Sequence, residues 1–509
     1  MRSREFDQHR RSELALGKLA GGGLFAAAEC KAEREIARLR ARAGQDQIAK
    51  AGQADEGLTS HGNAFVRAPT TGLAATPAPS QWWTTLNDPQ LNALIDAALA
   101  HNPNLQAAQA RLRESREQLL QQRTKALPNL SVDAAAVRVR EPDLSLLQSS
   151  NNNAQGGQGT NTSSGRGPLQ LYTAAFDASW ELDLFGGVRR ATESSSAQAQ
   201  AVEADFADAQ VSLAAEVAQA YIGLRDQQQR LVLANQSTEL AQKTLELVQQ
   251  RRARGVAADA DVERQTTQVE NTRATLIPLD EQITESLDQL AVLTGQAPGA
   301  LDQALSKPSA LPILPAAVPV DDPASLLRQR PDIRAAERRL ASSNAQIGQH
   351  TADLFPKVTL MGFLGTTGVN PADLAKKSAL TWLGVPYLQW NVFDFGRTHS
   401  SIRQAEAGRD EAAAMYTQTV LAALQDANNA LSRYGHQRDS VARMQQIEAS
   451  ANRSERLTHQ RYGAGASSLI DLMDTQRTQF TAQQNLIQGQ ADLLKDFVSL
   501  QKSLGLGWQ

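Results

Sequence analysis

The chain has 509 residues, with 51 Lys and Arg against 54 Asp and Glu and a formal net charge of −3. Both signs are interspersed, so the sequence shows no basic footprint for a polyanion, and nucleic acid is not an expected partner. A single cysteine, Cys30, excludes an internal disulfide and a cysteine-based metal site. No run of about 18 apolar residues occurs, so the sequence predicts no transmembrane helix.

The first 80 residues are not expected to belong to a folded core. Residues 1–30 are basic, then weakly apolar, and end at Cys30, which is the outline of a bacterial export signal with a lipidated cysteine. Lys18 and Glu29 break that outline, and an ordinary thiol at Cys30 is an equal alternative. Residues 31–80 end rich in Pro, Ala and Thr, which predicts a poorly ordered linker.

Folded structure is expected to begin at Trp82. Asn87-Asp88-Pro89 predicts a helix to about residue 100, and Asn102-Pro103 starts another that runs to Leu127, where Pro128 stops it. Residues 129–140 predict a strand, and residues 141–168 a low-complexity loop.

A second strand follows, with a period of two. Every second residue from Tyr172 to Leu184 is apolar or small, and Asp177, Glu181 and Asp183 stand between them. The strand leads into a helix expected from Gly186 to Arg254, about 69 residues and about 100 Å long. Gly255 should break this helix, and a partner helix should run back to about residue 293.

The same plan then repeats. Trp390, Phe395 and Gly396 stand 210 positions after Trp180, Phe185 and Gly186, and Arg330-Pro331 stands 228 positions after Asn102-Pro103. The second half predicts a helix over 332–354, strands over 357–366 and 380–393, and helices over 396–462 and 467–504 with a turn at 463–465. We therefore expect two repeats, 81–297 and 324–509, joined by a proline-rich link, 298–323.

Four strands cannot stand alone in a bilayer, because every backbone group there must be paired and a spanning sheet must have no open edge. Three chains would supply twelve strands, which is within the range of outer-membrane barrels. The predicted fold class is therefore an α+β membrane protein, in which an internally duplicated protomer gives four strands to a trimeric barrel and long helical hairpins to a hollow cylinder.

Several motifs in fixed order resemble the TolC-like outer-membrane efflux proteins. These are the two strand-to-helix junctions, the strand starts at Leu127-Pro128 and Phe355-Pro356, and the stretch RYGAGASSLIDLMDTQ at 461–476; RPDIRAAERRL at 330–340 resembles the lipoprotein branch. The resemblance implies a homotrimer with a twelve-stranded barrel in outer-membrane lipid and a helical tunnel in the periplasm. It implies a passive exit channel that docks onto a periplasmic adaptor and an inner-membrane pump and exports small molecules.

The resemblance also implies the site residues, at the hairpin turns. Asp471 and Asp474, three residues apart on one helix face, would line the periplasmic entrance, although two solvated carboxylates are the alternative. Asp261 and Tyr462 would help hold the entrance shut. Some members use an arginine where this chain has Ser467, so Arg461 or Arg264 would have to substitute in any ion pair, and Leu469 and Leu472 could form an apolar constriction instead. The adaptor would land on the two turns, at Arg251, Gly255, Arg461, Gly463 and Gly465.

The strands allow two readings. Tyr172, Phe176, Trp180, Trp382 and Trp390 predict a lipid-facing band and interfacial girdle, or else the core side of a soluble sheet. The acidic residues between them favour the band, with a wet lumen that accepts cations on the other face.

No chemistry is predicted. The seven histidines lack metal-ligand spacing, and no phosphate-binding loop or nucleophile elbow occurs. We expect no enzyme, no cofactor and no metal. The alternative function is a periplasmic adaptor or coiled-coil scaffold without a pore, but an adaptor normally has one hairpin flanked by β-rich domains, whereas this chain has two hairpins.

Overall fold

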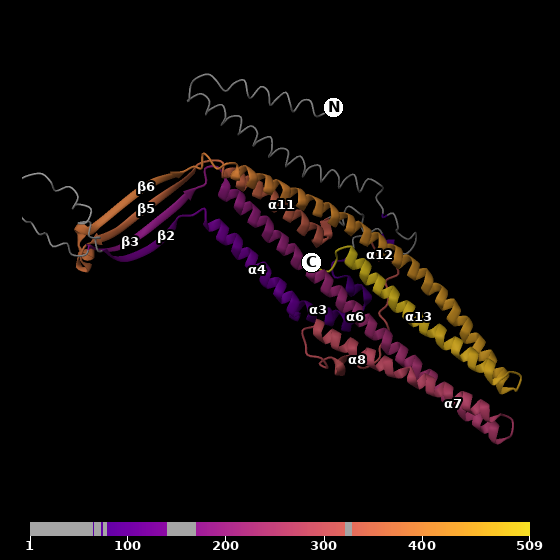
Figure 1. Cartoon of the computed structure of the whole chain (residues 1–509). Helices are drawn as coiled ribbons and strands as arrows, with labels where there is room; N and C mark the ends of the chain where they lie inside the picture. Colours follow the sequence, from indigo (N-terminus) through magenta and orange to yellow (C-terminus); the bar gives the residue numbers. More distant parts are fainter. Residues whose placement is uncertain (1–64, 66–72, 75–78, 140–168, 321–327, 509) are drawn as a thin grey trace, which may run out of the picture.

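The computed structural model describes residues 65, 73–74, 79–139, 169–320 and 328–508. A sheet lies at one end of an elongated molecule, and long helices lead from it to two hairpin tips at the other end (Figure 1). Within the described ranges, no helix has both the length and the apolar character needed to cross a membrane. The expected export signal with Cys30, and the loop predicted over 141–168, lie outside the described residues.

The first repeat matches the predicted order of elements. It contains η1 (Trp82–Leu86), α3 (Pro89–His101), α4 (Pro103–Thr124), β2 (Asn129–Val139), β3 (Leu169–Leu182), α6 (Gly187–Ala253), α7 (Asp259–Ala274) and α8 (Leu276–Leu293). The two predicted helix starts are confirmed, because Asp88 Oδ1 accepts from Gln90 N at 2.9 Å and Asn102 Oδ1 accepts from Asn104 N at 2.9 Å.

The second repeat contains α11 (Pro331–Ala352), β5 (Lys357–Gly368), η2 (Pro371–Ala375), η3 (Lys377–Ala379), β6 (Leu380–Gln389), α12 (Arg397–Gly463) and α13 (Leu469–Ser503). Between the repeats lie α9 (Asp302–Leu305) and β4 (Val318–Pro319). β4 pairs in parallel with β1 (Leu73–Ala74), so the linker expected over 31–80 does not hold for those two residues.

Two predicted boundaries were wrong. The partner helix of the first hairpin is not continuous: α7 ends at Ala274 and α8 begins at Leu276, because Pro278 has no N–H to donate to the carbonyl of Ala274. Its counterpart α13 has no proline and runs unbroken for 35 residues. β6 ends at Gln389 and not at Phe393.

The four strands of the main sheet are antiparallel, in the order β2-β3-β5-β6, so β2 and β6 are its edges. Their register places the even-numbered residues of all four strands on one face. On that face Phe176 lies opposite Leu364, which lies opposite Trp382. All three of these side chains are exposed in the single chain.

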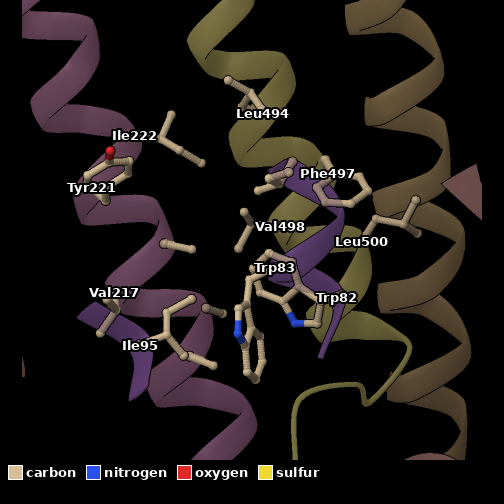
Figure 2. Close-up of a cluster of buried hydrophobic side chains, with 14 of the residues drawn as sticks. Trp82, Trp83, Ile95, Val217, Tyr221, Ile222, Leu494, Phe497, Val498 and Leu500 are labelled. Atoms are coloured by element: carbon tan, nitrogen blue, oxygen red, sulfur yellow. The ribbon is translucent and has the colours of Figure 1, made fainter. Parts of the chain in front are cut away.

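A helical core holds the two repeats together, and Figure 2 shows its densest part. Trp82 is 1% exposed and meets Phe497 of α13 edge-on at 6.0 Å, while Val217 and Ile222 of α6 lie nearby. The Tyr221 hydroxyl donates to Asp88 at 2.8 Å, and burial raises the pKa of Tyr221 to about 12. The residues before α3 therefore lock α6 of one repeat to α13 of the other.

The strand-to-helix junctions repeat in atomic detail. Trp180 Nε1 donates to the carbonyl of Ala126 at 2.9 Å, and Trp390 Nε1 donates to the carbonyl of Leu354 at 3.1 Å. The two donors are 210 residues apart and the two acceptors are 228 residues apart, which are the offsets found in the sequence. Each tryptophan therefore ties the end of one strand to the end of the helix before the preceding strand.

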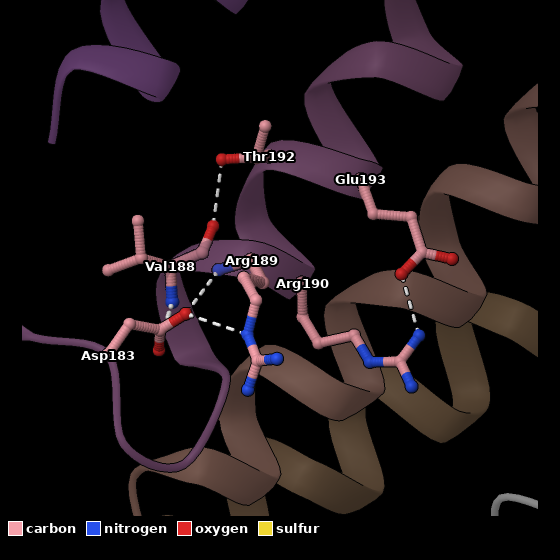
Figure 3. A network of polar contacts seen from close by, with 6 residues as sticks. All are labelled: Asp183, Val188, Arg189, Arg190, Thr192 and Glu193. Carbon is pink, nitrogen blue, oxygen red and sulfur yellow. Dashed lines mark hydrogen bonds and ion pairs between the residues drawn. The ribbon is translucent and has the colours of Figure 1, made fainter. Parts of the chain in front are cut away.

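An aspartate caps the long helix at each junction. Asp183 accepts from Val188 N and Arg189 N at 3.1 and 2.9 Å, as Figure 3 shows. Asp394 accepts from Gly396 N and Thr398 N at 2.9 and 2.7 Å, and these bonds, with that of the Thr398 side chain first, lower the pKa of Asp394 to about 2. Asp183 lies beyond the end of β3, so its predicted place on the lumen face of the strand was wrong.

Candidate gate and docking site at the hairpin tips

The two hairpin tips are built by the same turn. In the first, Gly255 N donates to Arg252 O at 2.8 Å and Val256 N to Arg251 O at 2.9 Å; in the second, Gly465 N donates to Tyr462 O at 3.1 Å and Ala466 N to Arg461 O at 2.8 Å. Both glycines have a φ of +75°, which side chains disfavour. This is the Schellman arrangement that ends a helix, and it explains why Gly255 and Gly465 recur 210 positions apart.

Arg251 joins one tip to the other. Its Nη2 donates to the carbonyl of Tyr462 at 2.8 Å, and its guanidinium carbon lies 4.1 Å from the centre of the Tyr462 ring. The predicted docking residue Arg251 is thus part of a contact within the protomer, and Tyr462 is 5% exposed beneath it. The sequence did not indicate this pair, because the partners come from different repeats.

Leu469 and Leu472 lie inside the protomer. They are 8% and 1% exposed and pack with Val248 and Tyr462 in one apolar cluster, which we call the tip cluster. The expectation that these leucines line an apolar constriction does not fit this arrangement, since side chains this buried do not face an opening. Their apolar surface is used to hold the second hairpin against α6.

Asp471 and Asp474 are both exposed, as a place at an entrance requires. Asp471 accepts from Ser467 Oγ and from Ser468 N, each at 3.1 Å, and its own N–H donates to Ser468 Oγ at 3.1 Å. This is a capping box. The hydrogen bonds from Ser468 and then Ser467 lower the pKa of Asp471. Ser467 therefore supports the carboxylate, at the position where the resemblance suggested an arginine in some family members.

Asp474 has a partner that the sequence analysis missed. Arg477, one helical turn further along α13, donates to its carboxylate at 2.9 Å, and both side chains are mostly exposed. The i,i+3 spacing was the available signal. Each protomer thus brings two carboxylates and one guanidinium to this face. The net charge is therefore less negative than two aspartates alone would give.

Asp261 plays the equivalent local role in the first hairpin. Its carboxylate accepts from Ala258 N at 3.3 Å and lies 3.5 Å from Arg264 Nη1. Arg264 thus pairs with Asp261 within one helix, which is not the pair between neighbouring hairpins that the sequence analysis considered for Arg264 or Arg461. Asp261 and Tyr462 therefore each have partners inside the protomer.

A cavity separates the two hairpins on the sheet side of the tip cluster. It has a volume of ≈ 320 Å³ and is lined largely by glutamine, asparagine and hydroxyl side chains, among them Gln236, Ser237, Asn271, Gln479 and Gln483. Arg251 and the tip cluster are therefore the main packing between the hairpins near their ends. Among the described residues, no three His, Cys, Asp or Glu side chains gather as metal ligands would.

Comparison with known proteins agrees with the fold. The model of the family described as "Outer membrane efflux protein" matches residues 94–296 and 323–506. Outer membrane protein OprJ of Pseudomonas aeruginosa is 31% identical over 429 residues, which cover 84% of this chain and 86% of OprJ. The pyoverdine export outer membrane protein OpmQ of the same species is 32% identical, over 84% of this chain and 88% of OpmQ.

Solved structures give the same result. The outer-membrane channel OprN superposes with a TM-score of 0.77 at 34% identity, over 88% of this chain and 98% of that one. The open state of the Neisseria gonorrhoeae MtrE outer membrane channel superposes with a TM-score of 0.74 at 26% identity, over 89% and 96%. None of these four relatives is an adaptor, a scaffold or an enzyme by name, so the alternative function gains no support. The chain belongs to the outer membrane efflux protein family.

Proposed function

We propose that three copies of this chain form a passive exit channel, which receives small molecules from a periplasmic adaptor and an inner-membrane pump and releases them outside the cell. The observation that carries this is the pair of open sheet edges, β2 and β6, at the end of a protomer built from two similar repeats. Unpaired edges need a partner in a bilayer, and a second and third copy supply it by symmetry.

The internal repeat indicates how neighbouring copies meet. Phe185, at the end of the first repeat's strand pair, stacks on Phe355, at the start of the second repeat's strand pair, with ring centres 4.7 Å apart and planes at 10°. By the offsets of 210 and 228, the next such contact would join Phe395 of one copy to Leu127 of the next. Phe395 is fully exposed and Leu127 is 62% exposed in the single chain, as unpaired interface residues should be.

We further propose that the hairpin tips are both gate and docking site. Asp471 and Asp474 would line the entrance as rings, with Arg477 reducing their charge. The contact of Arg251 with Tyr462, together with the tip cluster, would hold the two hairpins of each protomer in the closed arrangement. The adaptor would bind the exposed outer ends of the turns, at Gly255, Arg461, Gly463 and Gly465.

Purified protein in mild detergent and in planar bilayers tests the proposed function. Light scattering should give the mass of a trimer, and the trimer should conduct ions across the bilayer. A species that conducts with the mass of a single chain would contradict closure by three copies. Loss of pump-dependent export in cells that lack the protein, restored by the cloned chain, would link the channel to its pump.

A further inference from the structure

The second face of the sheet, made by the odd-numbered residues, carries both carboxylates and apolar side chains. β2 and β3 place Asp133, Asp177 and Glu181 there, together with Val137 opposite Leu171. β5 and β6 place five large apolar side chains there, which we call the odd-face patch: Met361, Phe363, Leu383, Val385 and Tyr387. Phe363 lies opposite Leu383 and Met361 opposite Val385, so the patch is continuous across both strands.

We assign the odd-numbered face to the inner side of the sheet, because it carries Asp133, Asp177 and Glu181. At the middle of the sheet Ala175 is 4% exposed, and a Cβ added to its partner Gly365 would come within 2.4 Å of the Ala175 Cβ. The even-numbered face carries Phe176, Leu364 and Trp382 in a row and none of these three carboxylates. Crowding on the odd-numbered side is what the inner side of a curved sheet gives, and its carboxylates are costly against lipid, so the odd-face patch is assigned to the lumen.

Carboxylates border the odd-face patch. Asp177 of β3 lies directly opposite Phe363, and Glu181 lies directly opposite Thr359, which in turn lies opposite Tyr387. Directly opposite residues have Cβ atoms about 5 Å apart. Lys357, on the same face, pairs with Asp353 at 3.0 Å and also interacts with the charge of Glu181, so Asp177 is the less compensated of the two carboxylates. Negative charge and apolar surface therefore lie within one small molecule's width of each other.

The interior of a wide outer-membrane barrel is ordinarily polar. An apolar patch in the lumen is therefore unusual, and covering it would be favourable because apolar surface would leave water. A small inorganic cation would satisfy the carboxylates and leave the apolar patch in water. A neutral hydrophobic molecule would cover the patch and leave the carboxylates unused. An organic cation with aromatic or alkyl groups matches both, and the rings of Phe363 and Tyr387 add cation–π attraction.

We infer that the odd-face patch, with Asp177 and Glu181 beside it, is a low-affinity binding site for lipophilic organic cations in the barrel lumen. This inference rests on the proposed channel function and names a substrate class for it. In the trimer the site would occur three times around the wall.

Single-channel recording with two ions of the same shape tests the inference. Tetraphenylphosphonium added to the extracellular side should reduce the current at a concentration at least about tenfold lower than tetramethylammonium needs, and tetraphenylborate, the anion of matching shape, should not. The double variant Phe363→Ser, Leu383→Ser and the single variant Asp177→Asn should each raise the half-blocking concentration of tetraphenylphosphonium about tenfold. Thr173→Ser, on the same face but away from the patch, is the matched control and should change nothing.

Each other outcome contradicts the inference in a recognisable way. Equal block by tetraphenylphosphonium and tetramethylammonium would show that the odd-face patch does not contribute to binding. Equal block by tetraphenylborate would show that the carboxylates do not contribute. Unchanged block in both variants would place the binding elsewhere in the channel, while the channel function itself stands. A well-assembled trimer that carries no current at all would overturn the proposed function and this inference with it.

Discussion

Arg251 on the first hairpin lies over the ring of Tyr462 on the second, 4.1 Å from its centre, and donates to the carbonyl of the same residue at 2.8 Å. Tyr462 itself belongs to the tip cluster, and a cavity separates the hairpins on the sheet side of that cluster. One side chain and a small cluster thus fix the relative position of the two tips, at the ends of helices about 100 Å long.

Replacing Arg251 should loosen the closed tip. Arg251→Ala removes a charge-assisted hydrogen bond and a cation–π contact, about 1–3 kcal/mol in all, and should raise the open fraction of single channels several-fold. Arg254→Ala, on the exposed side of the same turn, is the control and should leave the open fraction unchanged. An identical open fraction for Arg251→Ala and wild type would remove this contact from the gate.

Leu472→Ala tests whether Leu472 packs inside the tip cluster or lines the pore. Because Leu472 is 1% exposed in the tip cluster, the substitution should cost about 2–5 kcal/mol locally and speed amide hydrogen exchange at the start of α13. Exposed Ile470→Ala, two residues away, should affect exchange much less. A larger conductance with unchanged exchange would mean that Leu472 lines the pore after all.

Asp471 should keep its charge in moderately acidic solution. Its pKa in the folded protein is below the ordinary carboxylate value of about 3.9, so its bonds to Ser467 and Ser468 stabilise the tip above that value and are lost as the pH falls through the lower folded pKa. Cation selectivity should therefore persist at pH 5 and decline only below the ordinary range. Reversal-potential measurements down to pH 3 check this, and a midpoint near 5 would contradict it.

Charge and capping at Asp471 must be tested separately. Alanine at this position would remove the charge but also the capping box. Asp471→Asn with Asp474→Asn keeps a side chain that can accept at the cap and should reduce block by a trivalent cation while keeping the trimer. Block equal to that of wild type would return both residues to the solvated-face interpretation.

Substitutions of glycines at the two turns test whether the adaptor docks there. Gly255→Val and Gly465→Val meet no atom within 4 Å but force a β-branched residue to a φ of +75°, so they should distort the turns and reduce pump-dependent export while the trimer forms. Gly408→Ala, in the helical backbone of α12 away from the turns and with no atom within 4 Å, is the control and should be tolerated. Full export by the double valine variant would move the adaptor's landing site away from the turns.

Local signals in the sequence predicted most of the fold. Asp88 and Asn102 began helices as expected, because an N-cap acts within three residues, and the glycines at 255 and 465 ended them for the same local reason. The break at Thr275 could have been predicted from Pro278, because a proline inside a helix removes the hydrogen bond to the carbonyl four residues before it. Asp183 was misplaced because the alternation of period two continued past the end of the strand.

The candidate site was less predictable than the fold. The spacing of Asp471 and Asp474 predicted that they share one helix face. The burial of Leu472 and the contact of Arg251 with Tyr462 depend instead on how one hairpin packs on the other. The partners come from repeats about 210 residues apart, and no local pattern reports such a pairing.

Cross-linking between Phe395 and Leu127 tests most directly the proposal that copies of this chain close edge to edge. In a Cys30→Ser background, which leaves no other thiol, the pair Phe395→Cys, Leu127→Cys treated with a short bifunctional thiol reagent should run as a covalent trimer on a denaturing gel. Each single variant should run as a monomer, and Phe395→Cys with Leu120→Cys, two helical turns away on α4, should cross-link far less. A membrane-inserted, conducting protein that gives no cross-link at 395 and 127, or an equal one at 395 and 120, would contradict the proposed closure.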